Sequence, residues 1–284
     1  MTDRNAALTE SSTVTPTSST PLPLPEEQQA LFREVLLILE ETPFPYAVAG
    51  AFALRQHTGI CRFTKDLDIF LTTQVVGEAL GCLEQHGFEC EVADPVWLAK
   101  VHRDGYFVDL ITGMSSGVIA VEDSWVARAH PARVCGVDSR VLAPEETIAS
   151  KLFVTRRERF DGADIAHIIF GSQGQLDWDR ILQLAGDHWE LVLWALLLFR
   201  YVYPAHSHYV PQKIWDDLLT RFTQEIREPK ANTRFRGSLI DDAMFAIDVE
   251  EWAMDNVLEE YRAARPRIEL RKPCPACKSK RAAG

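Results

Sequence analysis

The chain has 284 residues, of which 46% are hydrophobic and 25% are charged, as is ordinary for a soluble globular protein with a real core. The formal net charge of −11 argues mildly against broad nucleic-acid binding, which needs clustered Lys and Arg, although a local basic patch is compatible with it. No stretch near the N-terminus resembles a signal peptide, and the longest apolar run, residues 191–199, is too short to span a bilayer. We therefore expect a cytoplasmic protein of one large or two modest domains, with no membrane partner and no disulfide framework.

The N-terminal half of the chain alternates between helix-like and strand-like patterns. Residues 1–25 are rich in Ser, Thr and Pro and are predicted to form a disordered arm, and residues 26–41 repeat apolar side chains at helical spacing. The elements predicted next are strand 46–49, helix 51–57, strand 66–71, helix 75–86, strand 88–92 and strand 105–112. Short strands and turns are expected over residues 118–141. These elements predict one α/β unit over residues 26–143.

From residue 144 the pattern becomes helical. The predicted helices are 144–160, 161–170, 178–184, 189–203, 211–223 and 241–261. The segment 189–203 is apolar nearly all round, which is typical of a buried core helix. Residues 265–284 are basic, contain proline and are predicted to be a loose tail. The second half therefore divides into a helical C-terminal region, 144–264, and this tail.

The strand predicted at 66–71 carries two acids. Alternate side chains of a strand share a face, so Asp66 and Asp68 are expected to point to one place while Leu67 and Ile69 point into a core. Two carboxylates on one face repel each other unless a cation lies between them, and oxygen ligands of this kind suit Mg²⁺. We predict a metal site here; the alternative is a pair of solvated acids at a strand end.

Two further positions extend this pattern. Gly50, in the turn before the helix, lets the backbone approach a ligand closely, and such a turn can hold a triphosphate with backbone N–H groups. Asp109 lies in the middle of an apolar strand, where an acid is costly to bury unless it is paired or metal-bound. Three acids on adjacent strands can hold two divalent ions, which activate an attacking hydroxyl and neutralise a leaving pyrophosphate. The pattern therefore predicts displacement chemistry on a triphosphate.

These motifs resemble those of the polymerase-β-type nucleotidyltransferase superfamily. Residues 48–71, VAGAFALRQHTGICRFTKDLDIFL, follow its pattern of Gly, then Gly or Ser, a gap, and two acids one residue apart, except that Ala51 stands at the second position. The stretch from about residue 30 to 170 looks most like the AbiEii-type branch, whose patterns GG-x-A and R-x-T-x-D-x-D correspond here to Gly50, Ala51, Ala53, Arg62, Thr64, Asp66 and Asp68. The resemblance implies an α/β (α+β) nucleotidyltransferase fold, with a small mixed sheet, flanking helices and a helical C-terminal portion.

The resemblance also implies roles for individual residues. Asp66 and Asp68 would bind Mg²⁺ or Mn²⁺, and Asp109 would complete the metal site and help to activate the acceptor. Lys151 would act with these acids by neutralising phosphate charge, although the alternative for Lys151, as for Lys65, is a solvated surface lysine. The remaining positions of a Lys–Arg–Asp motif are matched by Arg156 or Arg157 and by Asp161 or Asp164. The residues expected to contact the nucleotide are Gly50, Ala51, Arg62, Thr64, Lys65, Arg156 and Asp161.

The activity implied is transfer of a nucleoside monophosphate from an NTP to an acceptor hydroxyl on RNA, protein or a small molecule, with release of pyrophosphate. AbiEii-like proteins include toxins of toxin–antitoxin pairs, so an antitoxin-like protein is a possible partner by the same resemblance. Ala51 departs from the usual Gly or Ser at this position. A serine hydroxyl there can bind a phosphate, and alanine has no such group. The alternative function is therefore a weak or inactive nucleotidyltransferase-fold module that binds nucleotide or protein. Cys274 and Cys277 are too few to hold zinc without ligands from elsewhere.

Overall fold

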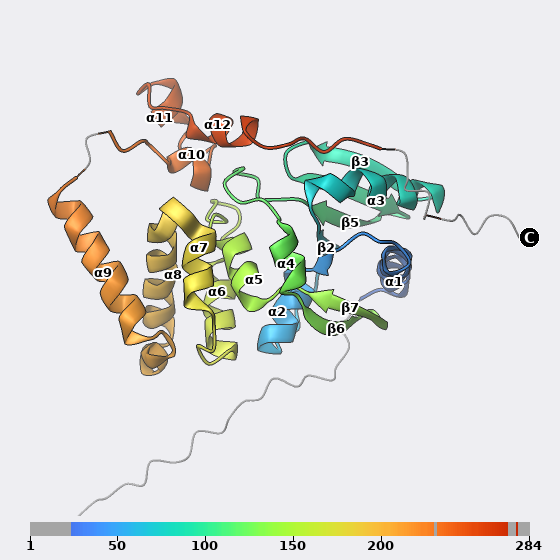
Figure 1. Cartoon of the computed structure of the whole chain (residues 1–284), viewed down its shortest axis with the longest axis horizontal. Helices are drawn as coiled ribbons and strands as arrows, with labels where there is room; N and C mark the ends of the chain where they lie inside the picture. Colours follow the sequence, from blue (N-terminus) through green and yellow to red (C-terminus); the bar gives the residue numbers. More distant parts are fainter. Residues whose placement is uncertain (1–23, 230–231, 272–276, 278–284) are drawn as a thin grey trace, which may run out of the picture.

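A mixed seven-stranded sheet organises the computed structural model, which describes residues 24–229, 232–271 and 277 (Figure 1). Its strands lie in the order β3-β4-β5-β2-β1-β7-β6. Their bounds are β1 Ala47–Val48, β2 Asp66–Phe70, β3 Glu89–Asp94, β4 Leu98–Arg103, β5 Tyr106–Ile111, β6 His130–Val134 and β7 Val137–Val141. β2 pairs parallel with β5 and β1 pairs parallel with β7, and the other neighbours are antiparallel. The prediction of a mixed sheet with flanking helices is confirmed.

Helices flank this sheet and form most of the chain after it. Those of the sheet region are α1 Glu26–Glu40, α2 Gly50–Thr58, α3 Thr73–Gln85 and α4 Asp123–Ala127. Those of the following region are α5 Pro144–Lys151, α6 Gly162–Gly171, α7 Trp178–Ala185, α8 Trp189–Val202, α9 Gln212–Arg227, α10 Gly237–Ile240, α11 Ala246–Glu250 and α12 Val257–Ala263, with the 3₁₀ helices η1 Gly186–His188 and η2 Pro204–Tyr209.

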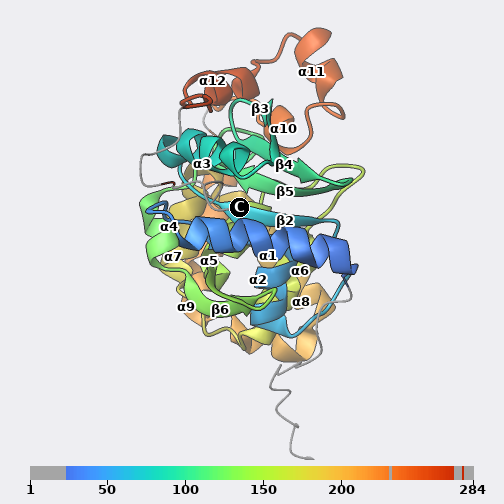
Figure 2. The ribbon, with the colours of Figure 1, turned by 90° about the vertical axis from the view of Figure 1, so that its right-hand side faces the viewer.

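The two faces of the sheet belong to different hydrophobic clusters. Helix α1 runs across the strands (Figure 2), and its buried Phe32 lies in one cluster with Leu67 and Ile69 of β2. Phe70 of β2 and Ile111 of β5 lie in the other cluster, together with helices of the C-terminal region. The alternation along β2 therefore turns its aliphatic side chains toward α1 and leaves its two acids on the side of the helical region.

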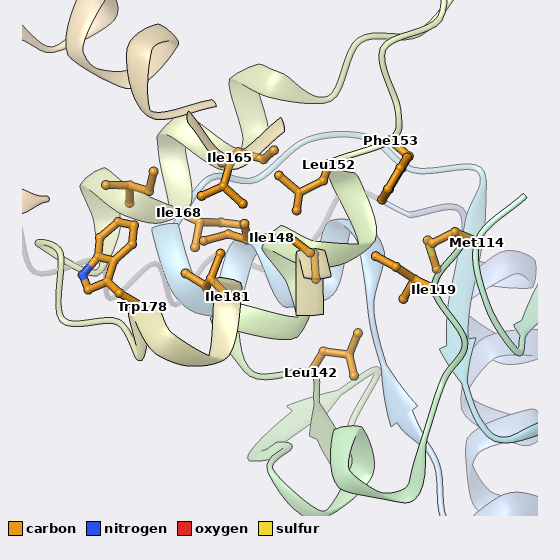
Figure 3. Packing of buried hydrophobic residues seen from close by; sticks show 14 of the residues in the cluster. Met114, Ile119, Leu142, Ile148, Leu152, Phe153, Ile165, Ile168, Trp178 and Ile181 are labelled. Carbon is orange, nitrogen blue, oxygen red and sulfur yellow. The ribbon is translucent and has the colours of Figure 1, made fainter. Parts of the chain in front are cut away.

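The helical region packs as a layer beside that second face. Figure 3 shows Ile148 of α5 between Ile165 and Ile168 of α6 on one side and Ile181 of α7 on the other, with Trp178 at the edge of the cluster. All of these side chains are at least 93% buried. Burial of large aliphatic and aromatic side chains contributes about 1.5–3 kcal/mol each. This layer therefore holds the C-terminal end of α5 and the N-terminal end of α6 in fixed positions beside the sheet.

The segment predicted as a fully buried helix has one exposed apolar side. In α8, Leu193 lies in the core, but Trp194 and Leu197 are 46% and 48% exposed. By length and composition alone, the helical span Trp178–Val202 could cross a membrane, as many core helices could. Here Gly186, with φ of +54°, separates α7 from α8, and both helices contribute to the second cluster.

The helix predicted over 144–160 is wrong in its second half. Helix α5 ends at Lys151, and the chain then turns back, with the backbone N–H of Asp161 donating to the carbonyl oxygen of Val154 at 3.0 Å. The carboxylate of Asp161 accepts from both Lys151 and Arg159. These contacts outweigh the helical propensity of the segment, because propensity differs by less than 1 kcal/mol for most residues.

Three other elements differ from the prediction. Strand β4 and helix α4 were not expected, although Ala99 and Val101 of β4 are buried at alternate positions as in other strands. The single helix predicted over 241–261 is wrong, since α11 and α12 are separate short helices. Asp241 accepts hydrogen bonds from the backbone N–H groups of Arg157 and Met244, which turns the chain at that point. A side chain that bonds backbone donors in this way favours a turn over a continuous helix.

The described part of the predicted tail is bound to the sheet region. The backbone N–H of Ile268 donates to the carbonyl oxygen of Pro95 at 2.7 Å, and its side chain is 4% exposed. Arg265 donates to the carbonyl oxygens of Gly117 and Val118. The predicted arm, except residues 24 and 25, and Cys274 lie outside the described residues.

Candidate active site

The three acids singled out in the sequence converge in the structure. Strands β2 and β5 are parallel neighbours, and their register places Asp68 opposite Asp109. Asp66 lies on the same face as Asp68, two residues earlier. Each of the three carboxylates offers one oxygen, and these oxygens all lie within 4.8 Å of one another. Strand alternation and strand register together thus bring Asp109 beside two acids that precede it by more than 40 residues in the sequence.

The glycine turn lies directly against this cluster. Gly50 has φ of +55°, and a Cβ placed on it would lie 1.8 Å from Oδ2 of Asp68. The backbone N–H of Ala49 donates to the carbonyl oxygen of Asp68 at 2.8 Å, which fixes the turn to the strand. Ala51 follows in the first turn of α2, whose N–H groups have no partners within the helix. Only glycine fits at position 50, because both the backbone conformation and the space exclude a side chain.

The environment of the cluster disfavours three ionised carboxylates. Burial, together with the charges of Asp66 and Asp109, raises the pKa of Asp68 to about 7. Burial also raises the pKa of Asp109, although Lys100 opposes this shift by donating to its Oδ1 at 2.6 Å. The hydroxyl of Thr64 donates to Oδ1 of Asp66 at 2.9 Å. A group of like charges so close together is favourable for binding a cation.

An ion-pair network forms the facing wall. Lys151, at the end of α5, is 5% exposed, and its ammonium group lies 2.9 Å from Asp161 and 2.8 Å from Asp164. Arg62 donates two hydrogen bonds of 2.8 Å to Asp164, and Arg159 donates two of 3.0 Å to Asp161. Burial alone would raise the pKa values of both acids, but these cations and hydrogen bonds lower them. The two walls thus carry opposite electrostatic conditions.

A cavity of about 480 Å³ separates the walls. Every residue predicted for the site lines it: Gly50, Ala51, Arg62, Thr64, Lys65, Asp66, Asp68, Asp109, Lys151, Arg156 and Asp161. Of the alternatives left open by the sequence, the cavity is lined by Arg156 and Asp161 and not by Arg157 or Asp164. Asp164 lies outside the cavity lining and forms ion pairs with Lys151 and Arg62.

Four residues that were not predicted for the site are Lys100, which contacts Asp109, and Arg159, Trp97 and Phe63, which line the cavity. Lys100 contacts Asp109 from β4. The sequence signal that could have identified this strand is the alternation of apolar and polar residues over 99–102. Arg159 lines the cavity and belongs to the same run of arginines as the predicted Arg156. Trp97 and Phe63 also line the cavity; Phe63 lies between the predicted residues Arg62 and Thr64, whereas Trp97 has no predicted site residue beside it in the sequence.

Comparisons with known proteins follow from this geometry. Residues 28–211 match the model of a family described as "Nucleotidyltransferase of unknown function (DUF6036)". No curated protein matches the chain.

Among solved structures, the antibiotic-resistance factor ANT(2'')-Ia is similar at 17% identity over 64% of this chain and 96% of its own, with a TM-score of 0.37. An antigenic nucleotidyltransferase-like protein from Paracoccidioides brasiliensis is 18% identical over 66% of this chain and 93% of its own, with a TM-score of 0.39. The lincosamide antibiotic adenylyltransferase LnuA is 14% identical over 51% of this chain and 96% of its own, with a TM-score of 0.35. These are distant likenesses. The family match covers well over half of the chain, including every acid of the cluster, and the protein therefore belongs to the nucleotidyltransferase family DUF6036.

Proposed function

We propose that the protein transfers a nucleoside monophosphate from an NTP to an acceptor hydroxyl and releases pyrophosphate, with Mg²⁺ or Mn²⁺ as cofactor. The observation that carries this proposal is the convergence of Asp66, Asp68 and Asp109 within 4.8 Å beside the turn at Gly50. Carboxylates alone would make a cation site; the adjoining turn adds backbone donors for a triphosphate.

The donor set fits a divalent ion. All three groups offer carboxylate oxygens, which hard cations prefer. The three oxygens lie within 4.8 Å of one another, so Asp66, Asp68 and Asp109 would be able to share a divalent ion. Burial and the charges of Asp66 and Asp109 raise the pKa of Asp68, which means that its ionised form is unfavourable in this cluster. A bound cation would stabilise that ionised form. When bound, the ion would lower the pKa of the acceptor hydroxyl and neutralise charge on the leaving pyrophosphate.

The chain's own residues would orient the reactants around this cluster. The acceptor oxygen attacks the α-phosphorus, and the bond between that phosphorus and the bridging oxygen of the pyrophosphate breaks. Lys100 donates a hydrogen bond to Oδ1 of Asp109. The Oδ2 atom of Asp109 receives no hydrogen bond from the described residues, so we propose that Oδ2 accepts the proton of the acceptor hydroxyl. Backbone N–H groups at Gly50 and Ala51 would hold the pyrophosphate end.

The facing wall would offset phosphate charge. Lys151, Arg62 and Arg159 outnumber Asp161 and Asp164, so this network has a net charge of about +1. Because Lys151 is held by both acids, we assign it a fixed position in the wall as well as its proposed role toward phosphate. Lys65, Arg156 and Thr64 line the same cavity and complete the proposed nucleotide contacts.

The setting of the reaction is part of the proposal. The motif from Arg62 to Asp68 supports kinship with the AbiEii-like branch, and with it a toxin-like role and an antitoxin-like partner. The acceptor is RNA, a protein or a small molecule, and the net charge of −11 favours the latter two. An NTP substrate implies a cytoplasmic location.

The test is a labelling experiment with the full chain. Each NTP, labelled at the α-phosphate, is incubated with Mg²⁺, cell extract and wild type, Asp68→Asn or Asp138→Asn. Asp138 is the matched control because its side chain is 91% exposed and it lies outside the cavity. Wild type and the control should label an acceptor and release pyrophosphate, and Asp68→Asn should not. If wild type labels nothing with any NTP, the enzyme proposal fails. The departure at Ala51 then favours the alternative of an inactive nucleotide-binding or protein-binding module.

A further inference from the structure

The aromatic residues around the cavity are of two kinds. Phe70, Phe153 and the partly buried Trp97 belong to the hydrophobic core or pack against it, and Phe63 does not. Phe70 stacks on Trp125 with ring centroids 6.0 Å apart, and Phe153 contacts His188 edge-on at 5.1 Å. Both are buried and belong to the hydrophobic core. Phe63 lines the same cavity but is 58% exposed. Among the described residues it contributes to neither hydrophobic cluster and pairs with no other ring.

The backbone that presents Phe63 is fixed on both sides. Arg62, the residue before it, is held by two hydrogen bonds of 2.8 Å to Asp164. Thr64, the residue after it, is 9% exposed; its hydroxyl donates to Asp66, and its carbonyl oxygen accepts from Gln28 at 3.1 Å. An exposed phenylalanine on a mobile loop would need no explanation. Here its neighbours hold the ring at the edge of the cavity without burying it.

We infer that Phe63 is the stacking platform for the nucleobase of the incoming nucleoside triphosphate, an assignment that rests on the function proposed above. Phe63 precedes Asp66 by three residues, so the two Cα atoms lie at most about 11 Å apart. With the α-phosphate at the acid cluster and the pyrophosphate at Gly50, the ribose and base extend away from the turn. Phe63 offers the exposed aromatic surface within that reach.

This placement assigns a class of substrate to the site. Stacking on one aromatic face accepts every base, because each base has a π-face, and it gives little sequence readout. The guanidinium of Arg62 and the ammonium of Lys65 flank the ring in the sequence and suit the anionic part of a nucleotide. The protein should therefore accept several nucleoside triphosphates, with purines bound more tightly because of their larger ring systems.

The test compares two probes that share a triphosphate and differ in the base. Equilibrium binding of ATP and of inorganic tripolyphosphate, both with Mg²⁺, is measured by calorimetry for wild type, Phe63→Ala, Phe63→Leu and Phe63→Trp. We expect Phe63→Ala and Phe63→Leu to weaken ATP binding about tenfold and Phe63→Trp to retain it, while tripolyphosphate binding stays unchanged in all variants. Because Phe63 is exposed, thermal unfolding should show the same melting temperature for the variants and wild type.

The possible outcomes separate this inference from the proposed function. Equal weakening of both probes, or unchanged ATP binding in Phe63→Ala, overturns the stacking role while the nucleotidyltransferase proposal stands. Unchanged ATP binding with slower transfer to the acceptor assigns the ring to the acceptor and overturns the nucleobase role. If wild type binds neither probe in the presence of Mg²⁺, the proposed function fails, and the inference fails with it.

Discussion

The two walls of the cavity contain similar numbers of acids in opposite circumstances. On the sheet side, Asp66, Asp68 and Asp109 face one another, and the pKa values of Asp68 and Asp109 are raised by burial and by their neighbours. On the helical side, Asp161 and Asp164 alternate with three cations, and their pKa values are lowered by those partners, although burial opposes the shift.

This difference distinguishes a site from a scaffold. Charges that compensate one another within the chain stabilise a position and need nothing from outside. Charges that the chain compensates only in part, as on the sheet side, where Lys100 pairs with Asp109, are unfavourable until a ligand arrives, and perturbed groups of this kind are concentrated at functional sites. Removing an acid should therefore have opposite consequences on the two walls.

The largest effect on activity should come from removing an acid on the sheet side of the cavity. Asp68→Asn should reduce nucleotidyl transfer about 10³-fold, since a metal-bound site supplies several kcal/mol to the transition state. The same change should raise the free energy of unfolding of the metal-free protein by on the order of 1 kcal/mol, because it removes repulsion. Pyrophosphate release and urea denaturation measure the two effects. A variant that is both active and less stable would contradict the comparison.

The compensated wall should respond in stability. Asp164→Ala leaves Lys151 and Arg62 without their shared partner and should lower the free energy of unfolding by about 3–5 kcal/mol, as expected when one member of a buried ion pair is removed. The matched control is Asp242→Ala. Asp242 pairs with Arg156 at 3.8 Å with both side chains about half exposed, and its loss should cost at most about 1 kcal/mol. Urea denaturation of both variants decides whether the network is structural.

A pH series should sharpen the same point. The pKa of Asp161 is lower in the folded protein than in the unfolded chain, so the unfolded state binds the proton first as the pH falls. The stability that Asp161 contributes is thus fully present above about pH 4 and is lost at lower pH. The free energy of unfolding of wild type should exceed that of Asp161→Asn by about 2 kcal/mol at pH 7, and this difference should disappear below pH 4. A gap that widens with acid would show that the carboxylate is not the stabilising form.

The smallest effect concerns the turn. Ala51→Ser would restore the hydroxyl that the superfamily pattern carries, and one additional hydrogen bond of about 1 kcal/mol should tighten binding of ATP with Mg²⁺ about fivefold. Ala51→Gly is the control, because it keeps the backbone N–H without adding a hydroxyl. If both variants bind ATP like wild type, the side chain at this position does not contact the triphosphate.

Periodicity and local motifs accounted for the sheet side of the cavity. Alternation in 66–71 placed Asp66 and Asp68 on one face, and Gly50 was recognised from its position before a helix. These are local properties, and strand alternation depends on few residues. The resemblance to nucleotidyltransferases rested on the same stretch and is supported by the family match over residues 28–211, whereas the AbiEii-like branch remains a prediction.

The helical side depended on contacts that periodicity does not encode. The early end of α5 at Lys151 depends on Asp161 and Arg159, which are brought back by a turn. Lys100 contacts Asp109 only because β4, a strand that the sequence analysis had not predicted, pairs with β5. Long-range pairing of this kind overrides local propensity, so it could not be predicted from one sequence.

The pairing of Asp68 with Asp109 has a consequence for how this site can change. Successive side chains of a strand point to opposite faces, so inserting or deleting one residue at the start of β5 would turn Asp109 away from the cluster. No intermediate spacing exists, because the register moves in whole residues. Insertions before β2 or after β5 fall in connecting loops and leave the three oxygens where they are. A shift of one residue in β5 therefore removes Asp109 from the cluster completely, while the surrounding loops can vary in length.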